Sequence, residues 1–345
     1  MLAPIPQWLG FTPPEFTEEI ILQQLWKNYS LDGKLESLEG EREQNFRFLT
    51  SSDETFLVRI SHLEEDSAML DYHALALNHL NNVDRIGVVP KMINTVESKH
   101  NAYLGQNKNI LRVFSYLPGK PLSQGDVSGL KLALNAGLLL GQTTQQLAKL
   151  KKPDISYFMS WDMTNGLLSQ DLLWSCAGKD LLKYRSGLLT NTCIPVLAAI
   201  KDFRQTFVHN DAHLDNMLRN NNADLTISGL IDFGDAMVTQ PICDLAILCL
   251  GFADSSQTPE QSIASAAAGY HEQYPLLKQE LDVLWSLVLT RELFSLLLFD
   301  YKIYHDVSAT DYVREARPHM AENLIKLLTL NTDSIRDALF DACKI

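Results

Sequence analysis

Four polar residues in the second half of the chain have the types and the spacing that phosphoryl transfer requires. Asp211 stands two residues after His209, Asn216 follows five residues after Asp211, and Asp232 opens an Asp-Phe-Gly sequence a hairpin's length further on. In kinase-type transfer a carboxylate accepts the proton of the attacking hydroxyl, while an Asn and a second Asp hold the magnesium ions that neutralise the triphosphate. The spacing therefore predicts Asp211 as the catalytic base, Asn216 and Asp232 as Mg2+ ligands, and His209 as a structural support of the loop.

Two other interpretations of this region stay open at the level of sequence. In one, the polar residues are ordinary turn residues that cap short strands. In the other, imidazole and carboxylate groups form the two-metal centre of a hydrolase, made of His209, Asp211, His213 and Asp215. The hydrolase interpretation leaves the Asn and the Asp-Phe-Gly aspartate without a role. The sequence contains no Walker A loop and no Gly-x-Ser-x-Gly motif.

The elements that must position these residues fall into two groups. The first third of the chain predicts strands at 34–38, 44–49 and 55–60, followed by a helix from 64 to about 81. The segment 117–121 is rich in Pro and Gly and is the candidate hinge.

Beyond the hinge the chain reads as mainly helical, with one embedded hairpin that carries the polar residues. Pro318 should kink or split the last helical stretch, 309–330. We expect an α+β, two-lobed fold, with a small N-terminal lobe of strands and one helix over 1–116 and a mainly helical lobe over 117–345, which carries the predicted catalytic residues.

Composition narrows the classes of partner. The 345 residues include 29 basic and 42 acidic side chains, which gives a net charge of −13. This balance argues against nucleic acid and anionic membranes as partners. The longest apolar stretch, 283–299, is broken by Arg291 and Glu292, so it predicts a buried helix rather than a membrane span. The expected location is the cytoplasm, and the sequence does not predict an oligomeric state.

Taken together, these motifs resemble the aminoglycoside phosphotransferase family, which has a protein-kinase-like fold. Within that family the chain is most similar to the hydroxylysine kinase branch, which acts on amino alcohols. The resemblance spans nearly the whole chain and rests on the segments 40–46, 114–121, 208–216, 228–235, 244–246, 268–271 and 280–282.

The resemblance implies a nucleotide site in the N-terminal lobe. Gly40 to Asn45 would form the turn over the phosphates, and the backbone of Phe114 to Tyr116 would bind the purine edge. Arg59 occupies the strand position where the family has a lysine that contacts the α- and β-phosphates. Arginine keeps the charge but is longer and forked, so this departure bears on nucleotide affinity. A glutamate expected on the following helix is also absent, with Asp71 or His73 near its position.

The resemblance also implies roles in the helical lobe. Asp244 corresponds to the aspartate that hydrogen-bonds the catalytic loop, although it also suits an N-cap position. Arg291 interrupts an apolar helix, and a buried charge needs a partner. That partner is either a substrate carboxylate or a structural carboxylate. The full set of substrate candidates is Asp235, Tyr270, Arg291 and Asp300.

The sequence therefore predicts a small-molecule kinase that uses Mg2+ and transfers the γ-phosphoryl group of ATP or GTP. The acceptor would be a hydroxyl of an amine-bearing substrate such as a hydroxylysine-like amino alcohol. Two alternatives are a nucleotide-binding module with weak or no catalysis and an aminoglycoside-type antibiotic phosphotransferase. Only eleven residues separate Asp232 from Asp244, which leaves no room for the long activation segment of a protein kinase.

Overall fold

The computed structural model describes residues 13–83, 89–106, 108–155, 159, 161–165, 170–221, 225–255, 258–306 and 310–345. The described residues form two compact units, the first ending at Leu117 and the second beginning at Pro118. The sequence placed the boundary after residue 116. The functional division into a nucleotide-binding and a catalytic lobe stays a prediction. We describe each unit by itself.

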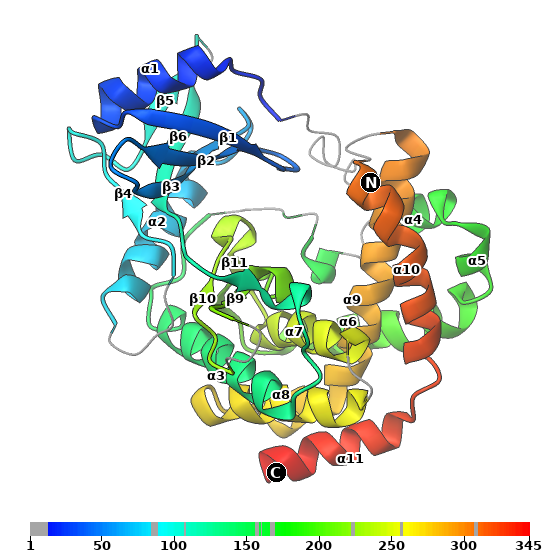
Figure 1. Cartoon of the computed structure of the whole chain (residues 1–345). Coiled ribbons are helices and arrows are strands. Elements are labelled where there is room, and N and C mark those ends of the chain that lie inside the picture. The colour runs from blue at the N-terminus through cyan, green and yellow to red at the C-terminus, as the bar shows by residue number, and fades with distance from the viewer. Residues whose placement is uncertain are drawn as a thin grey trace. The chain divides into compact units, whose positions relative to one another are not determined.

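The first unit is built on a six-stranded antiparallel sheet in the order β1-β2-β3-β6-β4, with β5 also paired to β6 (Figure 1). Two tight hairpins connect the first three strands, as the turn residues at 39–43 and 51–54 lead one to expect. The elements of this unit are α1 (Glu18–Tyr29), β1 (Gly33–Leu38), β2 (Gln44–Thr50), β3 (Thr55–Ile60), α2 (Ser67–Asn81), β4 (Met92–Ile93), β5 (Ala102–Leu104) and β6 (Asn109–Ser115).

The two faces of this sheet have different chemistry. Side chains alternate along each strand, so one face collects the apolar residues of neighbouring strands and packs against α1. Phe46 and Phe48 of β2 and Val58 and Ile60 of β3 lie in this core. The polar residues between them necessarily point to the opposite face, which carries the site candidates of this unit.

The second unit is mainly helical and carries two small antiparallel sheets. One sheet has the order β10-β9-β7 and the other pairs β11 with β8. A π-helical segment spans Arg185–Cys193. The strands are β7 (Lys120–Pro121), β8 (Thr206–Val208), β9 (Met217–Arg219), β10 (Gly229–Leu230) and β11 (Met237–Thr239). The helices are α3 (Leu130–Leu147), α4 (Gln170–Cys176), α5 (Lys179–Leu182), α6 (Ile194–Ala199), α7 (Pro241–Ser255), α8 (Pro259–Gln273), α9 (Lys278–His305), α10 (Asp311–Leu327) and α11 (Thr332–Cys343).

Helices α3 and α8 lie against each other along much of their length (Figure 1). Their backbones approach closely because glycines face the partner helix. A Cβ placed on Gly137 would lie 2.0 Å from the carbonyl oxygen of Ala266, and one on Gly269 would lie 2.0 Å from that of Leu134. Any larger residue would force the helices apart.

The long helix α9 forms the centre of this unit and contacts α7, α10 and α11. It is buried over most of its length, as predicted for the stretch 283–299. Within the described residues, no helix combines the length and the apolar character needed to cross a membrane. Pro318 lies inside α10, which continues to Leu327, so the predicted split is wrong. Proline removes a single ladder hydrogen bond, and α10 is bound to α9 on both sides of it, through Arg317 to Asp300 and through Asn323 to Glu292.

Candidate active site

The catalytic loop begins where β8 ends, and its first residues are hydrogen-bonded to Asp244 on α7. The carboxylate of Asp244 accepts the backbone N–H of His209 at 3.2 Å and that of Asn210 at 2.9 Å. Burial raises the pKa of Asp244 to about 7, although these two donors act in the opposite direction. Asn210 adopts a left-handed backbone conformation with φ of 62°, so the loop turns sharply just before Asp211. Asp244 lies inside the first turn of α7, which begins at Pro241, so its carboxylate supports the loop and does not occupy the N-cap position.

His209 is fully buried and links the loop to the segment before the Asp-Phe-Gly sequence. Its Nε2 lies 2.8 Å from the carbonyl oxygen of Ile231, and its ring packs edge-on against Phe233 at 4.6 Å between centroids. Burial lowers the pKa of His209, and the nearby carboxylate of Asp211 opposes that shift only in part. A neutral, fully packed imidazole of this kind braces two segments.

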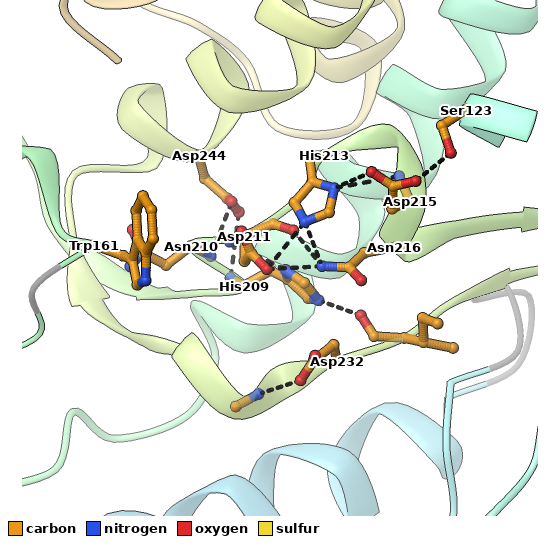
Figure 2. A network of polar contacts seen from close by, with 12 residues as sticks. Ser123, Trp161, His209, Asn210, Asp211, His213, Asp215, Asn216, Asp232 and Asp244 are labelled. Atoms are coloured by element: carbon orange, nitrogen blue, oxygen red, sulfur yellow. Dashed lines mark hydrogen bonds and ion pairs between the residues drawn. The ribbon is translucent and has the colours of Figure 1, made fainter. Parts of the chain in front are cut away.

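Asp211 and Asn216 are in direct contact (Figure 2). The side-chain nitrogen of Asn216 donates to the Asp211 carboxylate at 2.8 Å and to the Asp211 backbone carbonyl at 2.9 Å. Because the nitrogen is used in this way, the amide oxygen of Asn216 points away from Asp211. The Asp211 carboxylate is partly exposed, as a base that meets a substrate must be.

Asp232 lies on the neighbouring turn in Figure 2. The backbone N–H of Ile231 donates to the carbonyl oxygen of Asn216 at 2.9 Å, which fixes Asp232 close to the catalytic loop. Asp232 itself has φ of 61°, an unfavourable conformation for a residue with a side chain, and its carboxylate is solvent-exposed. The sequence prediction that these segments converge is therefore consistent with the structure.

The donor set at this point suits a hard divalent cation. It consists of the Asp232 carboxylate and the outward-facing amide oxygen of Asn216. Mg2+ commonly takes one or two protein oxygens and completes its shell with water and substrate phosphates. Within the described ranges, no three His, Cys, Asp or Glu side chains converge on a common point that could hold a metal ion. The two-metal hydrolase interpretation therefore lacks its ligand cluster.

His213, which the hydrolase interpretation takes as a metal ligand, instead contacts two carboxylates of the loop. Its Nε2 lies 3.3 Å from the Asp211 carboxylate and its Nδ1 lies 3.3 Å from that of Asp215, as Figure 2 shows. Asp215 in turn accepts a hydrogen bond from the hydroxyl of Ser123. Burial lowers the pKa of His213, but the two carboxylates outweigh this effect and raise it to about 10. The imidazole thus lies between the two carboxylates, which favour its protonated form. The sequence signal for this contact is a repeated His-x-Asp pattern, first over 209–211 and again over 213–215.

Arg291 projects from α9 toward the same loop. One terminal nitrogen donates to the carbonyl oxygen of Trp161 at 2.6 Å, and the other lies 3.8 Å from the Asp211 carboxylate. The guanidinium also lies over the Trp161 ring. Burial lowers the pKa of Arg291, and the carboxylates of Asp211, Asp235 and Asp162 oppose that shift. The sequence left two possible partners for Arg291, a substrate carboxylate and a carboxylate of the protein. In the structure the carboxylate of Asp211 lies beside Arg291, so a partner of the second kind is present.

Two of the predicted substrate residues lie elsewhere, and we correct them here. Tyr270 has no exposed surface, because it is packed where α8 approaches Gly141 of α3. Asp300 is bound by Arg317 at 2.6 Å and 2.9 Å and also accepts the backbone N–H of Gly178 at 2.7 Å. These contacts join α9 to α10 and to the start of α5. Both side chains therefore have packing or bracing roles. Asp235 remains near Arg291.

In the first unit, the predicted phosphate-binding residues share one row on the polar face of the sheet. Asn45 pairs across the strands with Arg59, and Arg59 with Arg112. Gly40 lies at the turn above this row, where an added Cβ would come within 2.1 Å of the carbonyl oxygen of Glu43. Only glycine fits there. The structure thus brings Gly40, Asn45 and Arg59 together, as the sequence suggested.

The carboxylate that pairs with Arg59 comes from an unexpected place. Glu43 of the turn contacts Nε of Arg59 at 2.5 Å and a terminal nitrogen of Arg112 at 3.2 Å. Asp71, a candidate for this partner on α2, accepts a hydrogen bond from Asn101 instead. The sequence analysis did not single out Glu43.

Part of the backbone predicted to bind the purine edge, 114–116, is already hydrogen-bonded within the first unit. The N–H of Ser115 donates to the carbonyl oxygen of Lys91 at 2.8 Å, and that of Tyr116 to Thr55 at 3.3 Å. The N–H groups of these two residues are therefore already paired within the unit and do not point to a purine, whereas binding of the purine edge by this backbone stays a prediction. The ring of Phe114 is buried beside Arg112, while that of Tyr116 is exposed beside Arg47.

Comparison with known proteins identifies the family to which this chain belongs. Residues 34–278 match APH, the phosphotransferase enzyme family. This range includes the polar row of the first unit and the catalytic loop and Asp-Phe-Gly segment of the second. The chain belongs to this family and is a small-molecule phosphotransferase with an alcohol group as acceptor.

Its relatives include vertebrate proteins named hydroxylysine kinase. The one from Danio rerio is 21% identical over 314 residues, covering 88% of each chain, and the one from Mus musculus is 22% identical over 250 residues, covering 70% of this chain and 66% of that protein. Among solved structures, the fold is similar to an amicoumacin kinase in complex with AMP-PNP and Ca2+, with a TM-score of 0.70, 13% identity and coverage of 92% and 97%. It is also similar to a microcompartment-associated aminopropanol kinase, with a TM-score of 0.69, 17% identity and coverage of 91% and 100%.

Proposed function

We propose that this phosphotransferase moves the γ-phosphoryl group of ATP or GTP, with Mg2+, to the hydroxyl of a small amine-bearing alcohol of the hydroxylysine type. The observation that carries the proposal is the contact between Asp211 and Asn216, with Asp232 fixed next to them through Ile231. A proton acceptor and two oxygen donors for a cation then lie in one small region, as phosphoryl transfer requires.

Each residue of the site has a separate role in the proposed reaction. Asp211 accepts the proton of the attacking hydroxyl, and Asn216 keeps its carboxylate in one orientation. The amide oxygen of Asn216 and the carboxylate of Asp232 would hold the cation, which when bound would neutralise charge on the phosphates. Arg59 and the turn at Gly40 contact the phosphates of the nucleotide. Because little covalent chemistry falls to the protein, positioning provides most of the rate enhancement.

The acceptor class is inferred from the relatives and from charge. The names hydroxylysine kinase and aminopropanol kinase both describe small molecules that carry an amine and a hydroxyl. The acidic surface of this chain suits a cationic acceptor. Asp235 is the remaining candidate to contact the amine. The cytoplasm is the location we propose for the enzyme.

The first prediction tests the catalytic base. Asp211→Asn keeps the size of the side chain but removes the proton acceptor, so turnover should fall at least about a hundredfold. The measurement is nucleotide consumption with a panel of amino alcohols, hydroxylysine included, and with aminoglycosides. Asp202→Asn is the matched control, since Asp202 is exposed just before β8. If Asp211→Asn retains turnover, the assignment of the base is wrong. Binding of Mg-ATP without turnover of any acceptor by the natural protein would favour a nucleotide-binding module.

A further inference from the structure

Glu43 is a buried carboxylate at the centre of a charge cluster in the first unit. It is 9% exposed and contacts both arginines of the polar row, at 2.5 Å for Arg59 and 3.2 Å for Arg112. The hydroxyl of Ser61 donates to the same carboxylate at 3.0 Å. A buried charge is retained only where partners of this quality compensate the loss of water. Glu43 is therefore held in one place by three groups, one on β3, one on β6 and one on the residue that follows β3.

Glu43 and the two arginines belong to different elements of the first unit. It belongs to the turn between β1 and β2, three residues after Gly40, whereas both arginines lie on the strands beneath. The contact therefore connects the turn to the sheet. Arg59 and Arg112 are direct cross-strand neighbours, and two like charges in such positions repel each other. A carboxylate between them removes that repulsion and fixes both side chains.

We propose that Glu43 is the positioning residue for Arg59, and that it replaces a helix carboxylate in orienting the phosphate-binding cation. This inference rests on the proposed nucleotide-dependent function. A guanidinium has donors on more than one edge, and Glu43 contacts the Nε edge. In the proposed arrangement, the contact with Glu43 holds the guanidinium at its Nε edge, and its terminal nitrogens contact the nucleotide phosphates. Because Glu43 belongs to the turn that covers those phosphates, the turn and the cation are fixed together.

The neighbouring Glu65 supports this arrangement. It precedes α2 and lies within electrostatic range of Arg59, Arg112 and Glu43. Burial raises its pKa, and the arginines oppose that shift. A second carboxylate beside two arginines keeps the cluster close to neutral. Glu43 makes the direct contact with Nε of Arg59 on which the proposal rests.

The second prediction is that Glu43→Gln weakens ATP binding on the order of tenfold, because a long arginine side chain loses its fixed orientation beside a repelling neighbour. Dissociation constants of ATP and adenosine are measured by titration calorimetry on the full chain with Mg2+. Adenosine has no phosphates, so its affinity should not change. Glu54→Gln is the matched control, as Glu54 is exposed in the other hairpin turn, between β2 and β3. Glu43→Asp keeps the charge and should restore part of the affinity.

A double-mutant cycle separates positioning from general support of the fold. In an Arg59→Met background, Glu43→Gln should cause no further loss of ATP affinity, because Glu43 acts through Arg59. An additive loss, an unchanged affinity or a gain in affinity for Glu43→Gln would each overturn the proposal. If Glu43→Gln does not fold, the same cycle is run with Glu43→Asp. Failure of the natural protein to bind ATP at all would instead contradict the proposed function.

Discussion

At the scale of single residues, three neighbouring side chains restrict the carboxylate of the proposed catalytic base. Asp211 is approached by an amide from Asn216, an imidazole from His213 and a guanidinium from Arg291. Each comes from a different position in the chain, so the carboxylate has little freedom to rotate. Effective proton transfer depends on such a fixed geometry at least as much as on basicity. The surrounding donors are therefore part of the machinery.

The third prediction concerns Arg291. Arg291→Lys keeps the positive charge but cannot contact Asp211 and the Trp161 carbonyl together, so kcat should fall about 10- to 100-fold. The KM of the acceptor should change little, because the guanidinium acts on the base. Steady-state kinetics check this, with Arg314→Lys as control, since Arg314 pairs with Asp306 at the surface. A rise in KM with kcat intact would show that Arg291 binds a substrate carboxylate instead.

Some residue roles could be predicted from the sequence and others could not. Asp211, Asn216 and Asp232 could be identified because their function fixes their spacing along the chain. Glu43 could not, because its partners lie on strands whose facing side chains are known only once the register is known. Tyr270 was misassigned because the same types of side chain also serve packing, as its burial between α3 and α8 shows.

At the scale of elements, periodicity was informative wherever one face is buried. The strands expected at 34–38, 44–49 and 55–60 match β1 to β3 within one residue at each end, because apolar and polar residues alternate there. Helix α1 was not assigned, although Ile21 and Leu25 stand at helical spacing and form part of the core. Short strands such as β8 and β11 have no periodicity of their own and form because loops bring them together.

The fourth prediction concerns the packing of α9 against α10. The amide of Asn323 donates to Glu292 at 3.0 Å. Burial raises the pKa of Glu292 from 4.5 to about 7, the Asn323 hydrogen bond and Arg291 oppose this shift, and Asp254 adds to it. The folded state therefore binds a proton that the unfolded state releases between about pH 4.5 and 7. The contribution of Glu292 to stability is present below this window and is lost as pH rises through it.

Glu292→Gln should remove this dependence on pH. The stability of the natural protein minus that of the variant should fall by about 3 kcal/mol between pH 4.5 and 8, at about 1.4 kcal/mol per pKa unit. Urea unfolding at several pH values measures both. Glu322→Gln is the control, because Glu322 is exposed next to Asn323 on α10. A difference that stays constant with pH would show that Glu292 is ionised in the folded protein.

At the scale of the whole molecule, charge is the property that the sequence states completely. A net charge of −13 over 345 residues produces a negative potential around the protein at low ionic strength. Such a field attracts cations and repels anions whichever groups make contact at the site. The two proposed substrates have opposite charges, since the acceptor carries an amine and the nucleotide carries phosphates. The same field should therefore affect their binding in opposite directions.

The fifth prediction follows from this asymmetry. Raising KCl from about 20 to about 300 mM shortens the Debye length severalfold and should lower kcat/KM for an amine-bearing acceptor on the order of two- to fivefold. A neutral diol of similar length, which lacks the amine, should show no such decrease, and sucrose at equal osmolality should leave both unchanged. The KM of the nucleotide should stay constant or fall, because salt screens its repulsion. An equal response of the charged and the neutral acceptor would mean that the field of the protein does not contribute to recognition. Selectivity for amines would then have to come from direct contacts such as one with Asp235, and Asp235→Asn would remove it.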